Sequence, residues 1–311
     1  MKSYLTGLTL AGLAVLLAAS AVVLGWRIAG QASDRSLSDH ETVTLTAAGA
    51  SYFSPTRLAE ITNAALVETD TITAAASGGY SAIAVWDVRE SVYDATNDQQ
   101  LEPTSRTVAF DRESAELVNC CGENIDGDGL IWQDGIAGYA FPVGTRKQTY
   151  DVFDTVLDKP EPFAYSGTDI VDGMPAYRFA ENISAAKAGF SALSSADPQA
   201  YSMHRVYWVD PETGMLLKVT ENEDLYLANP TTGSPVTQLF QADLQTTPAT
   251  VERLASQDAG RRGEIALLAN ARLVLFVVAC GLALLAGCLL VRRAGRRLGR
   301  RLLPSRSPDG Q

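Results

Sequence analysis

The chain has 311 residues, a formal net charge of −11 and four cysteines. Apolar residues make up 46% and charged residues 20%, a composition that excludes a disordered or collagen-like protein. The charge is segregated. Residues 3–26 and 273–291 have none, the 292–311 tail has seven arginines and one aspartate, and the segment 27–272 carries −18 once Lys2 is counted. This pattern indicates a membrane protein with an acidic middle domain, and it excludes a cytoplasmic enzyme or a nucleic-acid binder.

The first apolar segment, residues 3–26, is long enough to cross a bilayer. As a helix it would span about 36 Å, against a hydrocarbon core of about 30 Å. The alternative is a cleaved signal peptide, whose apolar run is shorter, at about 7–15 residues. We therefore expect a membrane anchor over 1–26, with Trp26 at the outer interface. A short polar linker over 27–41 follows it.

The second apolar segment, residues 273–291, would span about 28 Å as a helix and is also long enough. A juxtamembrane helical segment is expected over 249–272 and a basic cytoplasmic tail over 292–311. Basic clusters stay on the cytoplasmic side, and Lys2 places the N-terminus there too. The sequence thus predicts a two-pass plasma-membrane protein with both termini inside and the main domain outside. The arginines that act as this topology signal are Arg292, Arg293, Arg296, Arg297, Arg300 and Arg301.

The segment between the two spans, 42–248, is predicted to be mostly β, an α+β fold with an antiparallel sheet. Runs of alternating, β-branched residues predict its strands. Asp172-Gly173 predicts a hairpin turn, and Asp210-Pro-Glu-Thr-Gly214 predicts a type I turn ending in a left-handed residue. The strand-like runs are 42–46, 82–93, 106–110, 115–119, 163–170, 174–181, 205–209 and 215–220.

Three further features concern local structure. Ser54 followed by Pro55 is typical of a helix start, so a helix is expected over 55–63. Residues 182–200 are small and mildly apolar, and are expected to form a helix or a mobile flap. Phe110-Asp111 and Val209-Asp210 begin similar strand–turn–strand stretches 99 residues apart, which indicates either an internal duplication or two ordinary hairpins.

The sequence contains no recognisable catalytic motif. His40 and His204 are its two histidines, and neither has a partner that would make a serine triad. There is no nucleophile elbow, phosphate-binding loop or dinucleotide fingerprint. We therefore expect no enzyme activity and no cofactor. Asn124, Asp126 and Asp128 resemble the start of a calcium loop, but Gly135 replaces its final glutamate, so a surface turn is the better interpretation.

Cys120 and Cys121 are adjacent and lie in the part of the chain expected outside the membrane. Neighbouring Cα atoms are about 3.8 Å apart, below the usual disulfide range of about 4.4–6.8 Å. A vicinal disulfide would close a tight turn before Gly122 and is the favoured interpretation. Free thiols or an intermolecular bridge are the alternatives.

Aromatic residues concentrate between 132 and 165. The ordinary interpretation is a hydrophobic core. The functional alternative is the wall of an apolar groove that holds a lipid. Trp132, Phe141 and Phe153 are the candidates for such a groove.

A series of motifs resembles the PorA family of actinobacterial envelope proteins. Its most specific block is Asn119-Cys-Cys-Gly-Glu123, followed by Phe141-Pro-Val-Gly-Thr145, Ala176-Tyr-Arg-Phe179 and Tyr207-Trp-Val-Asp-Pro211. The resemblance covers nearly the whole chain. It implies an outward-facing domain anchored at both ends, and the family name implies a cell-wall channel. Some relatives are connected with mycolic-acid envelope growth and with the handling of trehalose mycolates.

The expected function is therefore that of a non-enzymatic envelope protein. Its outer domain would bind or help traffic a mycolate-type lipid such as trehalose mycolate, or dock onto a lipid exporter or a protein of the elongation complex. The alternatives are a porin-like cell-wall channel and a purely structural scaffold. The expected partners are the membrane, that lipid and those proteins, with no nucleic acid.

Overall fold

The computed structural model describes residues 2–33, 41–75, 82–101, 103–187 and 199–301. The chain divides into two compact units. One unit, residues 32–262, is built on strands, and we call it the outer domain after its predicted location. The other is helical and combines residues 1–31 with 263–311.

The outer domain is a twelve-stranded antiparallel sheet, which confirms the predicted fold class. The strands follow the order β6-β5-β3-β2-β1-β12-β11-β10-β9-β8-β7, and β4 pairs with β3 off this path. Their bounds are β1 (Glu41–Ser54), β2 (Ala59–Ala74), β3 (Ile83–Asp94), β4 (Gln99–Gln100), β5 (Thr104–Asp111), β6 (Asn124–Ile125), β7 (Tyr150–Asp154), β8 (Lys159–Val171), β9 (Met174–Lys187), β10 (Gln199–Val209), β11 (Leu216–Ala228) and β12 (Pro235–Thr246).

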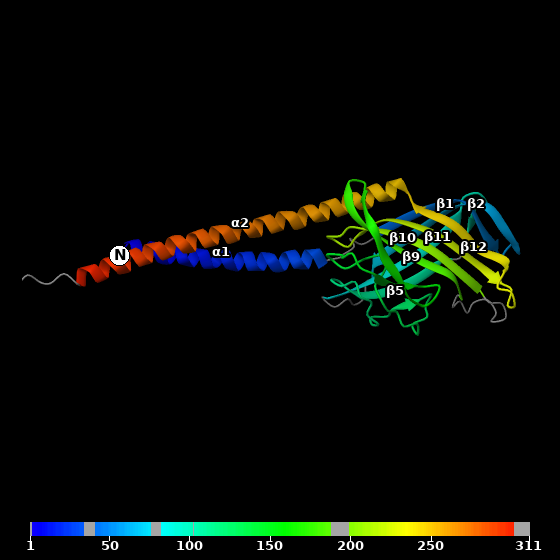
Figure 1. Ribbon diagram of the computed structural model, residues 1–311, viewed down its shortest axis with the longest axis horizontal. Coiled ribbons are helices and arrows are strands. Elements are labelled where there is room, and N and C mark those ends of the chain that lie inside the picture. The colour runs from blue at the N-terminus through cyan, green and yellow to red at the C-terminus, as the bar shows by residue number, and fades with distance from the viewer. Residues whose placement is uncertain (1, 34–40, 76–81, 102, 188–198, 302–311) are drawn as a thin grey trace, which may run out of the picture. The chain divides into compact units, whose positions relative to one another are not determined.

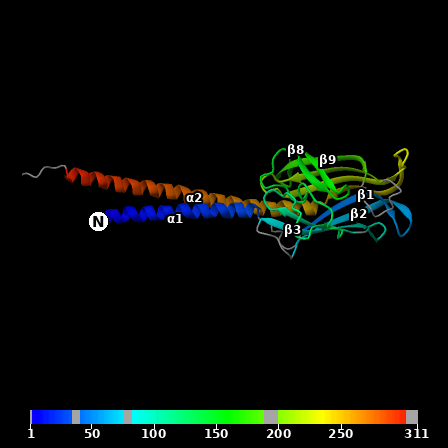
Figure 2. The same cartoon turned by 90° about the horizontal axis from the view of Figure 1, so that it is seen from below.

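The first and last strands, β1 and β12, pair in the middle of the sheet. From β1 the chain meanders outward through β2 and β3 to one edge, and from β7 it returns inward to β12 from the other. The sheet therefore has two flanks, an N-terminal one and a C-terminal one, whose long strands are visible in Figures 1 and 2.

The sheet curls so that its two flanks share one core. In β1 the register shifts between Ala48 and Ala50, and Gly49 between them has a φ of 72°. Such a bulge bends a strand and increases its twist. As a result, Leu66 of β2 and Phe179 of β9 belong to the same buried cluster although β2 and β9 are far apart in the sheet.

The connection between β5 and β7, residues 112–149, fills the space enclosed by the curl. Ala137, Ala140 and Phe141 from this segment are buried. The Phe141 ring stacks on Phe179 with centroids 5.1 Å apart and meets Tyr207 edge-on at 6.1 Å. Aromatic pairs at these separations stabilise a core beyond their buried area. The centre of the curl is therefore a packed aromatic core.

The predicted turns are confirmed at both positions. Asp172 and Gly173 have positive φ values and join β8 to β9. The Asp210 carboxylate accepts hydrogen bonds from the amides of Glu212 and Thr213, and Gly214 donates back to the Asp210 carbonyl.

The turn at Asp111 has the same pattern as the turn at Asp210. Its carboxylate accepts from the amides of Glu113 and Ser114, and the amide of Ala115 donates to the Asp111 carbonyl. Both turns also contact the filling segment, because Val143 donates to the Glu113 carbonyl and Gly144 to that of Glu212. The two stretches 99 residues apart are therefore alike in local structure as well as in sequence.

Two local predictions were wrong, and the described residues test a third only in part. Residues 55–63 are a turn followed by the start of β2, because Ser54 and Ala59 close the long β1–β2 hairpin. Residues 115–119 form isolated bridges only, Phe110 to Leu117 and Glu116 to Ile136. No helix forms in the described parts of 182–200, where β9 extends to Lys187 and β10 begins at Gln199; residues 188–198 lie outside the described ones.

Among the residues that the structure describes, two helices are long and apolar enough to cross a membrane: α1 (Lys2–Ser33) and α2 (Pro248–Arg301). Helix α1 extends past the predicted anchor, and residues 34–40 of the predicted linker lie outside the described ones. Helix α2 continues without interruption through the predicted juxtamembrane segment and span and into the basic tail. Thr247 caps its start, because the Thr247 hydroxyl accepts from the amide of Thr250 at 3.3 Å.

Within the helical unit, α1 and α2 lie side by side in both views (Figures 1 and 2). Four buried alanines mark the contact, Ala14 and Ala21 on α1 and Ala279 and Ala286 on α2. Each pair is seven residues apart, which places both members on one face of their helix. Small side chains allow two helix backbones to approach closely in a membrane.

Candidate functional site

The inward face of the sheet encloses a polar chamber of about 80 Å³. Its walls come from both flanks and from the segment that fills the curl. Four carboxylates and two guanidinium groups line it. The charged lining residues are Glu68 and Asp70 of β2, Glu90 of β3, Arg106 of β5, Arg205 of β10 and Glu221 of β11.

The carboxylates face one another because of strand register. Asp70 lies directly opposite Glu90 across β2 and β3. Glu68 is two residues from Asp70 and points to the same side of the sheet. Like charges placed opposite each other are destabilising. Acidic residues in this arrangement therefore need protons or counter-charges.

Arg205 supplies the counter-charge on the C-terminal flank. Its guanidinium lies 2.7 Å from Glu221, 3.5 Å from Glu181 and 3.9 Å from Asp154. Glu181 and Glu221 are its neighbours in register on β9 and β11. Desolvation alone would lower the pKa of Arg205, but the surrounding negative charge, that of Glu221 first, raises it above its usual value.

Burial favours the protonated form of the acids on the N-terminal flank. Burial raises the pKa of Glu68 and of Asp70 well above the usual range, and the charge of Glu90 adds to both shifts. Burial, with the charge of Glu221, raises the pKa of Glu90 to about 7. On β11, burial and Glu221 raise the pKa of Glu223 to about 8. The raised pKa values of Glu90 and Glu223 therefore lie near neutral pH.

Three buried polar atoms of the chamber's lining residues make no hydrogen bond among the described residues: Asp70 Oδ1, Arg106 Nη2 and Arg205 Nε, of which only Arg205 Nε has an ion-pair partner, Glu221 at 2.7 Å. Asp70 is 8% exposed and Arg106 7%. Arg106 is otherwise held in place: its Nε donates to Gln133 Oε1 at 2.7 Å, and its guanidinium lies 5.1 Å from the centre of the Phe153 ring. Leaving such atoms unpaired costs about 1–3 kcal/mol each.

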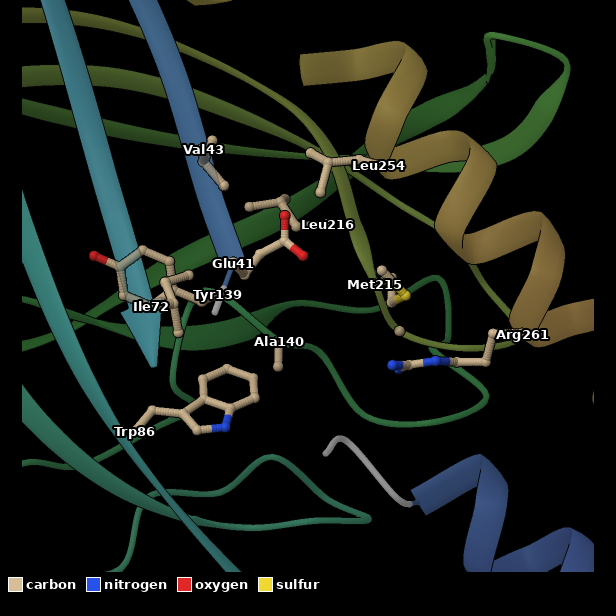
Figure 3. A pocket seen from close by; sticks show the side chains of 11 residues that line it. Glu41, Val43, Ile72, Trp86, Tyr139, Ala140, Met215, Leu216, Leu254 and Arg261 are labelled. Atoms are coloured by element: carbon tan, nitrogen blue, oxygen red, sulfur yellow. The ribbon is translucent and has the colours of Figure 1, made fainter. Parts of the chain in front are cut away.

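An apolar pocket of about 60 Å³ lies next to the chamber. Leu254 and Arg261 project into it from the first turns of α2, and Trp86 lies on its opposite side (Figure 3). Val43, Tyr139 and Leu216 line both spaces, so they form part of the wall between them. The other lining residues are Glu41, Ile72, Ala140, Gly214 and Met215.

The three aromatic residues predicted to line a lipid groove do not share one. Trp132 is 72% exposed on the connection between β6 and β7. Phe141 is fully buried in the aromatic core, and Phe153 lines the polar chamber. The prediction failed because proximity in sequence does not place side chains on the same face of an irregular segment.

The cysteine prediction is confirmed, since Cys120 and Cys121 form a disulfide. The calcium-like stretch is a turn: Asn124, Asp126 and Asp128 accept hydrogen bonds from the amides of Gly127, Ser105 and Leu130. Within the described part of the chain, His, Cys, Asp and Glu side chains make no group of three or more that would hold a metal ion.

The remaining predicted residues lie away from the chamber. His204 is exposed and bonds Asn182 at 2.7 Å, whereas His40 lies outside the described residues. Arg292 is exposed on α2, and the backbone helix continues through Arg301. The cytoplasmic side of this arginine cluster stays a prediction.

Sequence reasoning missed the chamber entirely, although one signal was present. Alternate residues of β2 point inward, and they read Ala64, Leu66, Glu68, Asp70 and Ile72. Two acids at core positions of a strand break the usual alternation. Such a break in the pattern of a strand indicates an inward-facing charged pair.

Comparison with known proteins shows the family to which the sequence is similar. The sequence matches the family described as Porin PorA over residues 6–289. A relative described as Porin PorA, from Corynebacterium resistens, is 32% identical over 99 residues, which is 30% of this chain. The match spans about a quarter of that relative, 24% of its length.

Proposed function

Since the chain belongs to the PorA family, we propose that it is a non-enzymatic membrane protein whose outer domain binds the apolar part of an envelope lipid of the mycolate type. The observation that carries this proposal is the apolar pocket beside the first turns of α2. A concave, mainly apolar site with a few polar groups is the usual form of a ligand site.

The chemistry of the pocket suits an amphiphile. Its interior is made of Val43, Ile72, Trp86 and Leu254, which favour an alkyl group. Arg261 adds a guanidinium, which presents five N–H donors in a fixed geometry. Such donors suit the hydroxyls or the carbonyl of a glycolipid head group.

The size of the pocket limits what it can take. Drug-sized ligands occupy pockets of about 300–1,000 Å³, whereas this one measures about 60 Å³. It therefore fits the end of an alkyl chain or a short branch, and the rest of a long acyl chain would remain outside. A protein that holds only part of a lipid suits transient handling better than storage.

The test is photo-crosslinking with the full chain in nanodiscs. A mycolate analogue with a diazirine at its alkyl end is expected to label residues of the pocket. Met215→Trp would fill the pocket and is expected to lower labelling about tenfold, the equivalent of about 1.4 kcal/mol of lost binding.

Ile170→Trp is the matched control, because Ile170 is 72% exposed and lies outside the pocket. It is expected to leave labelling unchanged. Labelling that is spread over the surface, or that is equal in the two tryptophan variants, would refute lipid binding at this pocket.

The second candidate is the channel that the family description names. A pore through the outer domain would have to cross the packed core of Phe141, Phe179 and Tyr207. A pore of helices would need several copies, because the described side chains that are buried in the helical unit are alanines. Single-channel recording in planar bilayers distinguishes this candidate: stable conductance steps from the purified chain would favour it over lipid binding.

The proposal extends to partners. A lipid held only in part has to be received from the membrane and passed on, so the proposed partners are the membrane and a lipid exporter or a protein of the elongation complex. In-cell crosslinking from exposed positions of the outer domain, such as Trp132, tests this part. Capture of neither class of protein would contradict it.

A further inference from the structure

The polar chamber has a chemistry that the lipid proposal does not use. It lies inside the sheet, beyond the wall that separates it from the apolar pocket. Its carboxylates outnumber its guanidinium groups by four to two. Asp70 Oδ1 is an acceptor without a partner among the described residues, on a side chain that is more than nine-tenths buried.

We propose that the chamber binds a small organic cation through its primary ammonium group, held by Asp70 and Glu90 against the aromatic rings of Tyr139 and Tyr207. An ammonium group has three donors and no acceptor, so it complements carboxylate oxygens. Hydrogen bonds between an ammonium and a carboxylate are short and stronger than neutral ones. Aromatic rings nearby attract the same cation.

An ammonium group fits this chamber better than a metal ion does. Metal ions such as calcium take six to eight oxygen ligands, and the described residues offer no group of three acids or other ligands that would hold an ion. An ammonium group needs fewer oxygens, and two carboxylates in cross-strand register supply them. The volume of about 80 Å³ also suits a compact amine.

The groups that face Asp70 set the charge of the site. Glu68 adjoins it on β2, Glu90 faces it from β3, and Arg205 and Glu221 face it from the C-terminal flank. Arg205 is already matched by Glu221 and Glu181. Arg106 is held in place by its hydrogen bond to Gln133 and by the contact of its guanidinium with the Phe153 ring. The chamber carboxyls that have no ion-pair partner among the described residues are therefore those of Glu68, Asp70 and Glu90.

Binding of an ammonium group is balanced in charge by the release of a proton. Burial raises the pKa of these carboxyls, which favours their protonated forms when the chamber holds no cation. When an ammonium group enters, a carboxyl releases its proton to the buffer and the net charge of the chamber is unchanged. Glu90, Arg205 and Glu221 are not fully buried, and the side chains of Arg205 and Glu221 are each 15% exposed.

The experiment is isothermal titration calorimetry with the full chain in nanodiscs made of phosphatidylglycerol. Ethanolammonium chloride is the probe, and potassium chloride at the same ionic strength is the control. We expect saturable binding near neutral pH. The heat should differ between phosphate and HEPES buffers, because these buffers absorb the released proton with different enthalpies.

Asp70→Asn keeps the shape of the side chain and removes the charge, and is expected to weaken binding at least about tenfold. Glu60→Gln is the matched control, since Glu60 is on the same strand but exposed. If Asp70→Asn does not fold, Glu90→Gln is measured in its place. No saturable binding up to about 10 mM, or equal binding by the wild type and both chamber variants, would overturn the proposal.

A further measurement distinguishes a lipid head group from a free amine as the natural ligand. The titration is repeated in nanodiscs of phosphatidylethanolamine, whose head group carries the same ammonium. Weaker binding of ethanolammonium there would identify a lipid head group as the ligand, and unchanged binding would identify a free amine. Either result supports the site. Since the probe has no alkyl tail, failure of this experiment leaves the lipid proposal to be judged on its own labelling test.

Discussion

Arg262 of α2 donates to Asp210 Oδ2 at 2.6 Å, and so joins the helix to the turn between β10 and β11. The same guanidinium lies 2.9 Å from Glu212. One turn earlier on α2, Asp258 accepts from the Thr213 hydroxyl at 2.5 Å. Asp210 and Asp258 are fully buried, so these contacts hold the start of α2 against the sheet.

Arg262→Ala is therefore expected to destabilise the outer domain. Removing one partner of a buried pair leaves the other charge uncompensated and costs about 3–5 kcal/mol. Arg262 itself is partly exposed, so solvent reduces the expected loss to about 1–3 kcal/mol. Urea denaturation of the full chain, followed by tryptophan fluorescence, measures it.

Arg261→Ala is the control for this variant, because Arg261 makes no ion pair with the described residues. Its expected effect on the free energy of unfolding is within about 0.5 kcal/mol. Equal effects of the two substitutions would show that the contact to Asp210 does not stabilise the domain.

The stability of the outer domain is expected to fall as the pH rises through neutrality. Burial raises the pKa of Glu90 from 4.5 to about 7 and that of Glu223 to about 8. When the pKa of a group is higher in the folded protein than in the unfolded one, folding favours the protonated form. The group then stabilises the fold fully below its pKa in the unfolded protein, and this contribution is lost as the pH rises through its pKa in the folded protein. Tm is expected to decrease by at least about 4 °C between pH 5 and pH 8, because each kcal/mol lost from the free energy of unfolding lowers Tm by about 2–4 °C.

Glu90→Gln removes one of these titrations and should flatten the profile. Its Tm is expected to exceed that of the wild type at the alkaline end, because a neutral amide replaces a charge that has to be buried. Glu60→Gln should follow the wild-type profile. A wild-type Tm that increases with pH over this interval would contradict the prediction.

Tyr52→Phe is expected to cost about 1–2 kcal/mol, because it removes a buried hydrogen bond. The Tyr52 hydroxyl donates to Asp94 Oδ2 at 2.9 Å, and both residues are almost fully buried. Tyr93→Phe removes a similar bond, to Asp98, at a 36% exposed residue and should change stability by less than about 0.5 kcal/mol. Chemical denaturation of both variants makes the comparison, and equal losses would refute it.

The Cys120–Cys121 disulfide is expected to add little stability. The loop that it closes is the shortest in any chain, so it restricts the unfolded state by only about 1 kcal/mol in the loop-entropy account. Reduction should therefore shift Tm by a few degrees at most. Mass spectrometry after alkylation measures its redox state: these two residues should react only after a reductant is added. Alkylation without reductant would show free thiols.

Much of the fold could be predicted because its signals are local. The hairpin at Asp172 and Gly173 depends on backbone angles that these two residues prefer, and the structure has those angles. The helix predicted after Ser54 failed because the same Ser-Pro pair suits a turn. Whether this pair begins a helix or a turn depends on the pairing of β1 with β2 (Ala59–Ala74). The few residues around Ser54 carry no information about that pairing.

The chamber was harder to predict because it depends on curvature. Asp70 and Glu221 approach each other only when the flanks curl together, since β12 and β1 separate their strands in the sheet.

The unbroken course of α2 was also hard to predict from the sequence. Gly260 and Gly263 each cost about 1 kcal/mol in a helix. Contacts of Asp258 and Arg262 with the sheet, which only the fold brings together, offset part of that cost.

The pairing of β1 with β12 has a practical consequence for anyone who shortens this chain. In many sheets the terminal strands are at the edges, where they can fray or be trimmed without harm to the rest. Here they form the middle of the sheet, and their pairing extends from Leu45 with Thr246 to Tyr52 with Phe240. Trimming from either end therefore divides the sheet in two, and a secreted fragment has to begin before Glu41 and continue past Thr246 to remain folded.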